Sequence, residues 1–268
     1  MSTLYCRTKL NYVDGNKVVP VAVDVHDARR LTPSLQEWGF EILRQSSAVK
    51  DWADEVQTGG IYLDEMEALA NRLTGCDAVL FYPGIRRSPE RFAEHPDLAP
   101  IRVVHSDYAE SYQLMLATPD HPYLDILQPS MDRLSVNRDQ VARATRIVTL
   151  QMWRNVGPRR PDQPLALCDG RSVRRDELLL HRVESYVGVD AQFDSFQVSP
   201  PLPPRAHHWY TFPAMTKDEL AVFRAYDSDL AAQGLPFWTP HSAFHDTSVD
   251  ATPEPRESFE IRAICLFW

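Results

Sequence analysis

A histidine and an aspartate stand two residues apart at the end of a short apolar run in IRVVHSDYAES, residues 101–111. Alternate residues of a β-strand point to the same side, so the side chains of His105 and Asp107 are expected to reach a common point. An imidazole and a carboxylate that meet there can bind a divalent metal ion. Spacing alone leaves a second interpretation open, in which Asp107 caps a turn and His105 packs in the core.

A second His-x-Asp, formed by His95 and Asp97, lies in the polar segment ERFAEHPDLAP. A proline separates the two residues, and no apolar run precedes them. This pair is interpreted as a solvent-exposed turn rather than a ligand pair.

The carboxyl-terminal part of the chain adds a third histidine and an anion-binding pattern. His241 follows an aromatic, apolar approach in PFWTPHSAFHD, and RESFEIR comes shortly after it. On a strand, Arg256, Ser258, Glu260 and Arg262 all face one side. Two arginines on an inward face are costly without an anion. Either Glu260 pairs with them in a buried ladder, or a guanidinium and the serine hydroxyl hold a carboxylate ligand.

Two imidazoles and one carboxylate on one face of a metal define the facial triad of non-haem Fe(II) oxygenases. In that interpretation the opposite face of the metal takes a 2-oxo acid and O2, and an arginine binds the far carboxylate of the 2-oxo acid. The order His-x-Asp, distant His, Arg-x-Ser is more specific than any of its parts.

Strands are expected to position these residues, and they dominate the second half of the chain. A short helix that stops at Gly39 and runs into a strand is expected at 31–43. Further helices are expected at 62–75, 107–118, 136–146 (capped by Asn137) and 216–231 (capped by Thr216, with Glu219 at the third position). Strands are expected at 18–25, 77–84, 147–153, 165–169, 182–189, 191–198, 207–213 and 258–268. Helices early and strands later favour an antiparallel sandwich or barrel with a helical flank.

Composition excludes several classes of partner. The net charge of −9 argues against nucleic-acid binding. No run of about 18 apolar residues is present, so no membrane span is expected. The amino terminus lacks the apolar core of a signal peptide. The four cysteines form no CxxC pair, which fits reduced thiols in a cytoplasmic protein.

Several blocks of the chain resemble the Fe(II)/2-oxoglutarate-dependent oxygenases. More closely, they resemble a branch with gibberellin desaturase-like, cephalosporin 7α-hydroxylase-like and aziridine-forming oxygenases of natural-product pathways. The blocks are DARR, GFEIL, TGCDAVLFYPGIRR, VVHSDYAES, MWRNVGPRRPDQPLALCDGRSV, HHWYTFPAMTKDELAVFRAYDSD, HSAFHD and PRESFEIR. The resemblance implies a mainly β, cupin-like double-stranded β-helix, or jelly roll, with flanking helices. It implies a single oxygenase domain over 1–268, with a helix and strand flank at 1–100 and a jelly-roll core with helical insertions at 101–268.

Residue by residue, the resemblance implies that His105 and Asp107 are the first two iron ligands and His241 the third. Arg256 and Ser258 match the positions that hold 2-oxoglutarate.

Alternatives stay open at several of these positions. His207, His208 and His245 compete with His241, which is preferred because the family's last histidine lies close to its arginine. Arg262 competes with Arg256 as the main clamp. The chain also departs from the family pattern: Gln151 replaces an expected asparagine and Asn155 an expected proline, both near the co-substrate.

The expected activity is oxidation of an unactivated C–H bond, with Fe(II), 2-oxoglutarate and O2 as cofactors and ascorbate as an aid in vitro. Hydroxylation, desaturation and ring closure are all compatible outcomes. The expected substrate is a small, carboxylate-bearing metabolite. Arg86, Arg154, Tyr108 and Arg262 are candidates to contact it, against surface or structural ion pairs for the arginines and core packing for the tyrosine. The alternative functions are a jelly-roll binding protein without redox chemistry and, less favoured because no Gly-x-Ser-x-Gly is present, a hydrolase.

Overall fold

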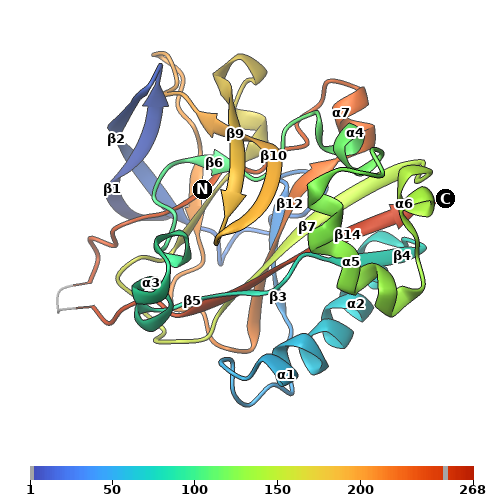
Figure 1. Ribbon diagram of the computed structural model, residues 1–268. Helices are drawn as coiled ribbons and strands as arrows, with labels where there is room; N and C mark the ends of the chain where they lie inside the picture. The colour runs from blue at the N-terminus through green and yellow to red at the C-terminus, as the bar shows by residue number, and fades with distance from the viewer. Residues whose placement is uncertain (1–2, 250–252) are drawn as a thin grey trace.

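Two β-sheets face each other in the computed structural model, which describes residues 3–249 and 253–268 (Figure 1). The eight-stranded sheet has the order β1-β2-β11-β8-β13-β6-β10-β9, and the six-stranded sheet has the order β3-β12-β7-β14-β4, with β5 paired to β14. All named pairs are antiparallel except β11 with β2. This is the mainly β jelly roll with flanking helices that the sequence predicts.

The strands of the eight-stranded sheet are β1 (Thr3–Asp14), β2 (Lys17–Asp27), β6 (His105–Ser106), β8 (Leu165–Cys168), β9 (Leu178–Tyr186), β10 (Val189–Val198), β11 (Trp209–Thr211) and β13 (His241–Ala243). The strands of the six-stranded sheet are β3 (Phe40–Arg44), β4 (Ala78–Phe81), β5 (Ile85–Arg87), β7 (Arg146–Asn155), β12 (Glu219–Asp227) and β14 (Ser258–Phe267). The segment before residue 100 therefore contributes strands to both sheets.

The α-helices are α1 (Glu55–Gly59), α2 (Ile61–Thr74), α3 (Pro89–Glu94), α4 (Tyr112–Leu116), α5 (Pro122–Leu134), α6 (Arg138–Ala142) and α7 (Ser228–Ala232). In Figure 1, α2 and α5 lie beside β4 and β14. Within the described residues, no helix is long and apolar enough to cross a membrane. The helix expected at 62–75 is confirmed as α2. The helix expected at 136–146 is confirmed only over Arg138–Ala142, as α6, and Asn137 caps it in a capping box.

Strand β14 has two different faces. Phe259, Ile261, Ala263 and Cys265 pack in one buried apolar cluster with Tyr62 and other side chains of α2. The alternate residues Ser258, Glu260 and Arg262 therefore point the other way, toward the space between the sheets. The expected alternation of this segment is confirmed, and it brings polar groups into the interior.

The helix expected at 216–231 is wrong, because most of this segment is strand β12 between β3 and β7. Glu219 does accept hydrogen bonds from the backbone N–H and the hydroxyl of Thr216, but this contact closes a turn that leads into a strand. Leu220 and Val222 pack on the α2 side of the sheet, and Phe223 packs on the inner side. Burial on both faces erases the period-2 pattern that identifies a half-buried strand.

The short helix expected at the start of 31–43 is also wrong, because this part forms turns. The strand expected after Gly39 is confirmed, since β3 begins at Phe40. Gly39 has φ +86°, and a Cβ there would lie 2.5 Å from the hydroxyl oxygen of Thr239. The close approach requires glycine at this point and ends the turn.

Candidate metal centre

Three of the predicted ligands come together at the inner face of the eight-stranded sheet. His105 on β6 and His241 on β13 are direct partners in the antiparallel pairing, and Asp107 follows β6. One ligand atom from each lies within 4.8 Å of the other two. Oδ1 of Asp107 is 4.0 Å from Nε2 of each histidine. In the part of the chain that the structure describes, this is the only such group of three.

Backbone carbonyls fix the orientation of both imidazole rings. Nδ1 of His105 lies 2.8 Å from the carbonyl oxygen of Val103, and Nδ1 of His241 lies 3.0 Å from that of Thr239. A carbonyl only accepts hydrogen bonds, so Nδ1 carries the proton and Nε2 presents its lone pair to the centre. Burial and the neighbouring His241 lower the pKa of His105 to about 3, so this ring is neutral at neutral pH. Imidazole rings held from behind, with Nε2 directed inward, fit a metal ion.

Asp107 is paired with Arg262. NH2 and Nε of the guanidinium lie 3.2 and 3.5 Å from Oδ1 and Oδ2 of the carboxylate. Burial raises the pKa of Asp107, but the guanidinium outweighs it and the pKa stays below the ordinary value. Asp107 is therefore an anion, and Arg262 is committed to it.

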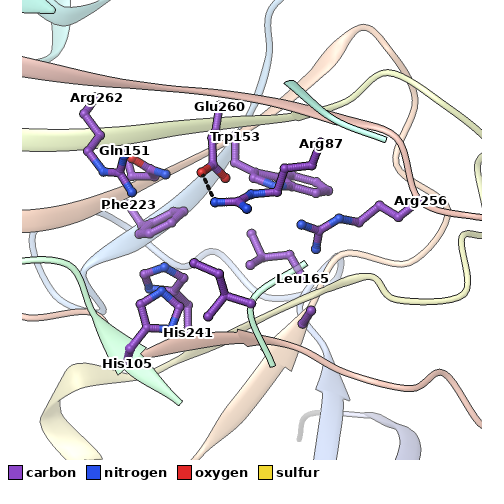
Figure 2. A pocket seen from close by; sticks show the side chains of 12 residues that line it. Arg87, His105, Gln151, Trp153, Leu165, Phe223, His241, Arg256, Glu260 and Arg262 are labelled. Carbon is purple, nitrogen blue, oxygen red and sulfur yellow. Dashed lines mark hydrogen bonds and ion pairs between the residues drawn. The ribbon is translucent and has the colours of Figure 1, made fainter. Parts of the chain in front are cut away.

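A cavity between the sheets connects this centre to other polar groups (Figure 2). It contains about 350 Å³ of space between the atoms, part of which is open to solvent. His105 and His241 line one side of it. The facing side comes from the six-stranded sheet and its β5 extension, with Arg87, Gln151, Trp153, Phe223, Glu260 and Arg262.

Arg256 is buried in the same cavity without an anionic partner. It is 5 % exposed, its guanidinium lies 5.6 Å from the ring centre of Trp153, and NH1 donates to the carbonyl of Gln163 at 3.2 Å. No carboxylate among the described residues is within ion-pair distance, and Nε has no partner there. Burial, followed by the nearby Arg87, lowers the pKa of Arg256 to about 10. A buried, uncompensated cation of this kind fits an anionic ligand.

Several other buried polar atoms also lack a partner among the described residues, and they include Oγ of Ser258 and Oε1 of Gln151. Gln151 lines the cavity and pairs in register with Arg262. Ser258 pairs in register with Asn155, whose amide donates to two backbone carbonyls and so stays fixed. An unpartnered Oε1 of Gln151 in the cavity wall fits a polar co-substrate there.

Arg86 and Arg154 do not line this cavity. Arg86 forms an ion pair with Glu257 at 3.0 Å. Arg154 lies on the α2 side of β7, where it donates to the carbonyls of Gln45 and Lys217 and stacks over Tyr62. Since neighbouring strand residues point to opposite sides, Gln151 and Trp153 face the cavity and Arg154 faces away. The contacts of Arg154 therefore support the fold and do not reach the cavity.

Tyr108 also packs in the core and does not line the cavity. Its ring stacks on Tyr112 with centroids 3.9 Å apart, and its hydroxyl lies 2.6 Å from that of Tyr123.

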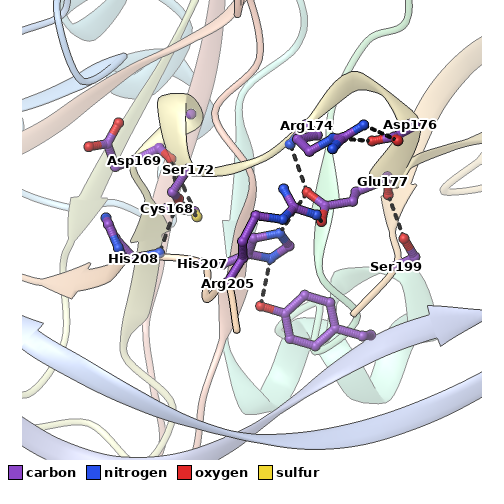
Figure 3. Close-up of polar contacts among 12 residues, drawn as sticks. Cys168, Asp169, Ser172, Arg174, Asp176, Glu177, Ser199, Arg205, His207 and His208 are labelled. Atoms are coloured by element: carbon purple, nitrogen blue, oxygen red, sulfur yellow. Dashed lines mark hydrogen bonds and ion pairs between the residues drawn. The ribbon is translucent and has the colours of Figure 1, made fainter. Parts of the chain in front are cut away.

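The competing histidines lie outside the cluster. His207 is buried between two other groups, with Nε2 3.2 Å from Glu177 and Nδ1 3.0 Å from the hydroxyl of Tyr12 (Figure 3). His208 and His245 are exposed. Asp97 donates its N–H to Nδ1 of half-exposed His95, which is the turn expected for the first His-x-Asp.

Sequence reasoning missed Arg87 as a cavity residue and assigned Glu260 only as a partner of the arginines on its own strand. Glu260 instead pairs with Arg87 at 2.9 Å. The adjacent arginines of GIRR differ only in strand phase, which places Ile85 and Arg87 inward. The sequence does not show where β5 begins, so it carries no signal that separates Arg87 from Arg86.

Comparison with known proteins agrees with this geometry. A family model described as an oxidoreductase/YMDC permease-like domain matches residues 7–266. The hydroxylase/desaturase CTB9 of Cercospora beticola is 31 % identical over 252 residues, which is 88 % of this chain and 72 % of that protein. The Fe(II)/2-oxoglutarate-dependent dioxygenase nvfI of Aspergillus novofumigatus is 26 % identical over 258 residues, covering 91 % and 83 %.

The fold matches a solved structure of the iron and α-ketoglutarate-dependent endoperoxidase NvfI, with a TM-score of 0.77, 22 % identity and coverage of 100 % and 99 % of the two chains. These relatives favour the redox enzyme over a jelly-roll binding protein without catalysis. The chain belongs to the Fe(II)/2-oxoglutarate-dependent oxygenases, and it is an oxidoreductase that uses Fe(II), 2-oxoglutarate and O2.

Proposed function

We propose that His105, Asp107 and His241 hold the Fe(II) ion of this oxygenase and that Arg256 holds the far carboxylate of 2-oxoglutarate. The observation that carries the proposal is a cluster of three converging ligand atoms, two of whose residues line one side of a cavity, with an uncompensated guanidinium on another side of that cavity. Two nitrogen lone pairs and one carboxylate oxygen match the facial triad and leave the other side of the metal open.

Ser258 and Gln151 are proposed to complete the co-substrate site. The hydroxyl of Ser258 donates to the carboxylate that Arg256 binds, and the amide of Gln151 contacts 2-oxoglutarate near the metal. Their buried polar atoms, unpartnered among the described residues, support these roles. A planar guanidinium binds a carboxylate with two parallel hydrogen bonds and so fixes its direction as well as its charge.

When bound, the metal and co-substrate supply the oxidation: O2 is consumed, 2-oxoglutarate becomes succinate and CO2, and a C–H bond of the substrate is oxidised. The protein's own groups prepare the site. Val103 and Thr239 hold the imidazoles in the ligating tautomer, and Arg262 holds Asp107 as an anion. Trp153 and Phe223 give the cavity apolar walls that limit water.

The proposed substrate is a small molecule of a natural-product pathway that bears a carboxylate. The names of the relatives, hydroxylase/desaturase, support hydroxylation or desaturation as the outcome. A second cavity shares Trp153 and Leu165 with the metal cavity and is lined by Arg159 and Arg160. Neither arginine forms an ion pair with any described residue, which supports an acidic ligand there.

An anaerobic titration with Fe(II) and 2-oxoglutarate tests the site, because the chelate gives a weak visible charge-transfer band. The wild-type protein is expected to show the band and His241→Ala to lose it. The matched control His245→Ala removes an exposed histidine four residues away and should keep the band. Loss of the band in the His245 variant, with retention in the His241 variant, would overturn the assignment.

A panel of small carboxylic acids and their methyl esters tests the substrate class through substrate-dependent succinate release. Acids should stimulate release and their esters should do so weakly. Equal stimulation by both would remove the carboxylate from the proposal while leaving the iron chemistry intact.

A single domain and a cytoplasmic location complete the proposal. All four cysteines are free, which supports a reducing compartment. Cell fractionation checks the location, and a single cooperative unfolding transition checks the domain organisation.

A further inference from the structure

Arg87 connects β5 to three other segments at the edge of the metal cavity (Figure 2). NH1 donates to the backbone carbonyls of Asp97 and Ala99, both at 2.7 Å. NH2 donates to the hydroxyl of Tyr186 at 2.6 Å and to Oε1 of Glu260 at 2.9 Å. The side chain of Arg87 is 2 % exposed. With all four terminal N–H groups engaged, Arg87 is held in place and is not available to bind substrate.

Three guanidinium groups and one carboxylate line this cavity: Arg87, Arg256, Arg262 and Glu260. Burial raises the pKa of Glu260, but Arg87 and the other two arginines hold it below the ordinary value, so Glu260 is an anion. Arg262 pairs with Asp107, outside this set, and Arg87 pairs with Glu260. Arg256 is the cavity cation left without a carboxylate among the described residues.

Two carboxylates lie near Arg256: Asp162 accepts a hydrogen bond from its backbone N–H, and Glu260 is the carboxylate that lines the cavity and can occupy the guanidinium in the absence of co-substrate. Glu260 and Arg256 belong to one short stretch of chain, and both line the same cavity. A buried carboxylate pairs with an available cation, since leaving either charge uncompensated in this interior is costly. The structure shows Glu260 turned to Arg87 instead, and the three other hydrogen bonds of Arg87 fix the guanidinium that holds it.

We infer that Arg87 is a positioning residue that keeps Glu260 away from Arg256, so that Arg256 stays free for the carboxylate of 2-oxoglutarate. This inference rests on the proposed role of Arg256. Without Arg87, Glu260 pairs with Arg256 and competes with the co-substrate from within the protein. If Arg256 is then free in only about one molecule in ten, the apparent affinity for 2-oxoglutarate falls about tenfold.

The test measures the dissociation constant of 2-oxoglutarate by calorimetry on protein loaded with Mn(II), without turnover. Arg87→Gln is expected to raise it about tenfold or more. The double variant Arg87→Gln/Glu260→Gln is expected to return to within about threefold of wild type, because the competitor has lost its charge. Glu260→Gln alone is expected to bind 2-oxoglutarate as tightly as wild type or more tightly.

Rescue separates this role from a purely structural one, since a damaged cavity is not repaired by a second buried substitution. Failure of Glu260→Gln to rescue the Arg87 variant would overturn the inference. If Arg87→Gln does not fold, the single Glu260→Gln variant decides: binding about tenfold weaker than wild type would show that Glu260 is not a competitor.

Arg256→Met distinguishes this inference from the proposed function. An unchanged 2-oxoglutarate affinity in that variant would remove Arg256 from the co-substrate site. Weaker binding in Arg256→Met, together with wild-type binding in Arg87→Gln, would leave the proposed function in place and overturn only the role of Arg87.

Discussion

The imidazole rings of His105 and His241 face each other across the β6–β13 pair, with their centroids 4.2 Å apart. Two protonated rings at this distance would repel each other strongly in a buried site. Each ring directs its Nε2 toward Asp107, and both are fixed from behind by a backbone carbonyl. The pair is therefore preorganised for a cation rather than for protons.

Replacement of one ring should remove metal binding. His105→Ala is expected to weaken Fe(II) or Mn(II) binding by more than about 100-fold, since loss of groups that only orient a ligand already costs 10–100-fold. The matched control is His95→Ala, from the exposed His-x-Asp turn, which should bind metal like wild type. Calorimetric titration with metal measures the affinity of both variants. Equal affinity in the two variants would contradict the ligand assignment.

The two arginines of the RESFEIR segment should affect different ligands. Arg256→Lys keeps the charge but loses the two-bond geometry, so the KM for 2-oxoglutarate should rise about tenfold or more. Arg262→Lys disturbs the carboxylate of Asp107 and should weaken metal binding about 10–100-fold with a smaller effect on 2-oxoglutarate affinity. Steady-state kinetics gives the KM, and calorimetric titrations of both variants with metal and with 2-oxoglutarate distinguish the two effects. The reverse result would make Arg262 the co-substrate clamp.

His207 should make stability depend on pH. Burial lowers its pKa in the folded protein, although the neighbouring Glu177 opposes this shift. The folded state therefore binds the proton more weakly than the unfolded chain. The contribution of His207 to the free energy of unfolding is fully present above the histidine pKa of the unfolded chain, near 6.5. It declines as the pH falls below that value, by at most about 1.4 kcal/mol per pH unit.

His207→Gln should therefore flatten the dependence of the unfolding free energy on pH between about pH 7 and 5.5. Denaturant unfolding at several pH values measures it. The exposed neighbour provides the control, because His208→Gln should keep the wild-type slope. An unchanged slope in His207→Gln would show that this imidazole is not held neutral.

Arg154 should matter for stability rather than for substrate. Its guanidinium donates to the carbonyls of Gln45 and Lys217, and it is fully buried. Arg154→Met leaves these acceptors without a donor and should destabilise the protein by about 2–4 kcal/mol. Thermal unfolding measures this loss. A stable Arg154→Met variant with a raised substrate KM would instead restore the substrate-binding role expected from the sequence.

Much of the fold follows from sequence where polar and apolar residues alternate or where caps bound an element. The alternation at the start of β14 and the cap and glycine that bound α6 and α2 are local signals, and the structure agrees with them. Strand β12 is the counterexample. Both β12 and β14 are buried on both faces, but the apolar residues of β12 show no period of two, and the turn between Thr216 and Glu219 imitates a helix start.

The residues of the candidate site also fall into two groups, those that the sequence predicts and those that it does not. His105, Asp107 and His241 lie together as the sequence predicts, because strand alternation and family spacing both identify them. Arg87 was not identified, because its position depends on how β5 pairs with β14 across a long stretch of sequence. Pairing register between distant strands is a property of tertiary structure, and no local pattern encodes it.

The proposed metal ligands lie on strands of the eight-stranded sheet or directly after one of them, whereas the proposed co-substrate contacts lie on or next to strands of the six-stranded sheet. A molecule bound to both at once links the two sheets. 2-Oxoglutarate is thus expected to couple the local opening motions of the two sheets. Amide hydrogen exchange in β13 and in β14 should slow together when metal and co-substrate are both bound, but not when metal alone is bound.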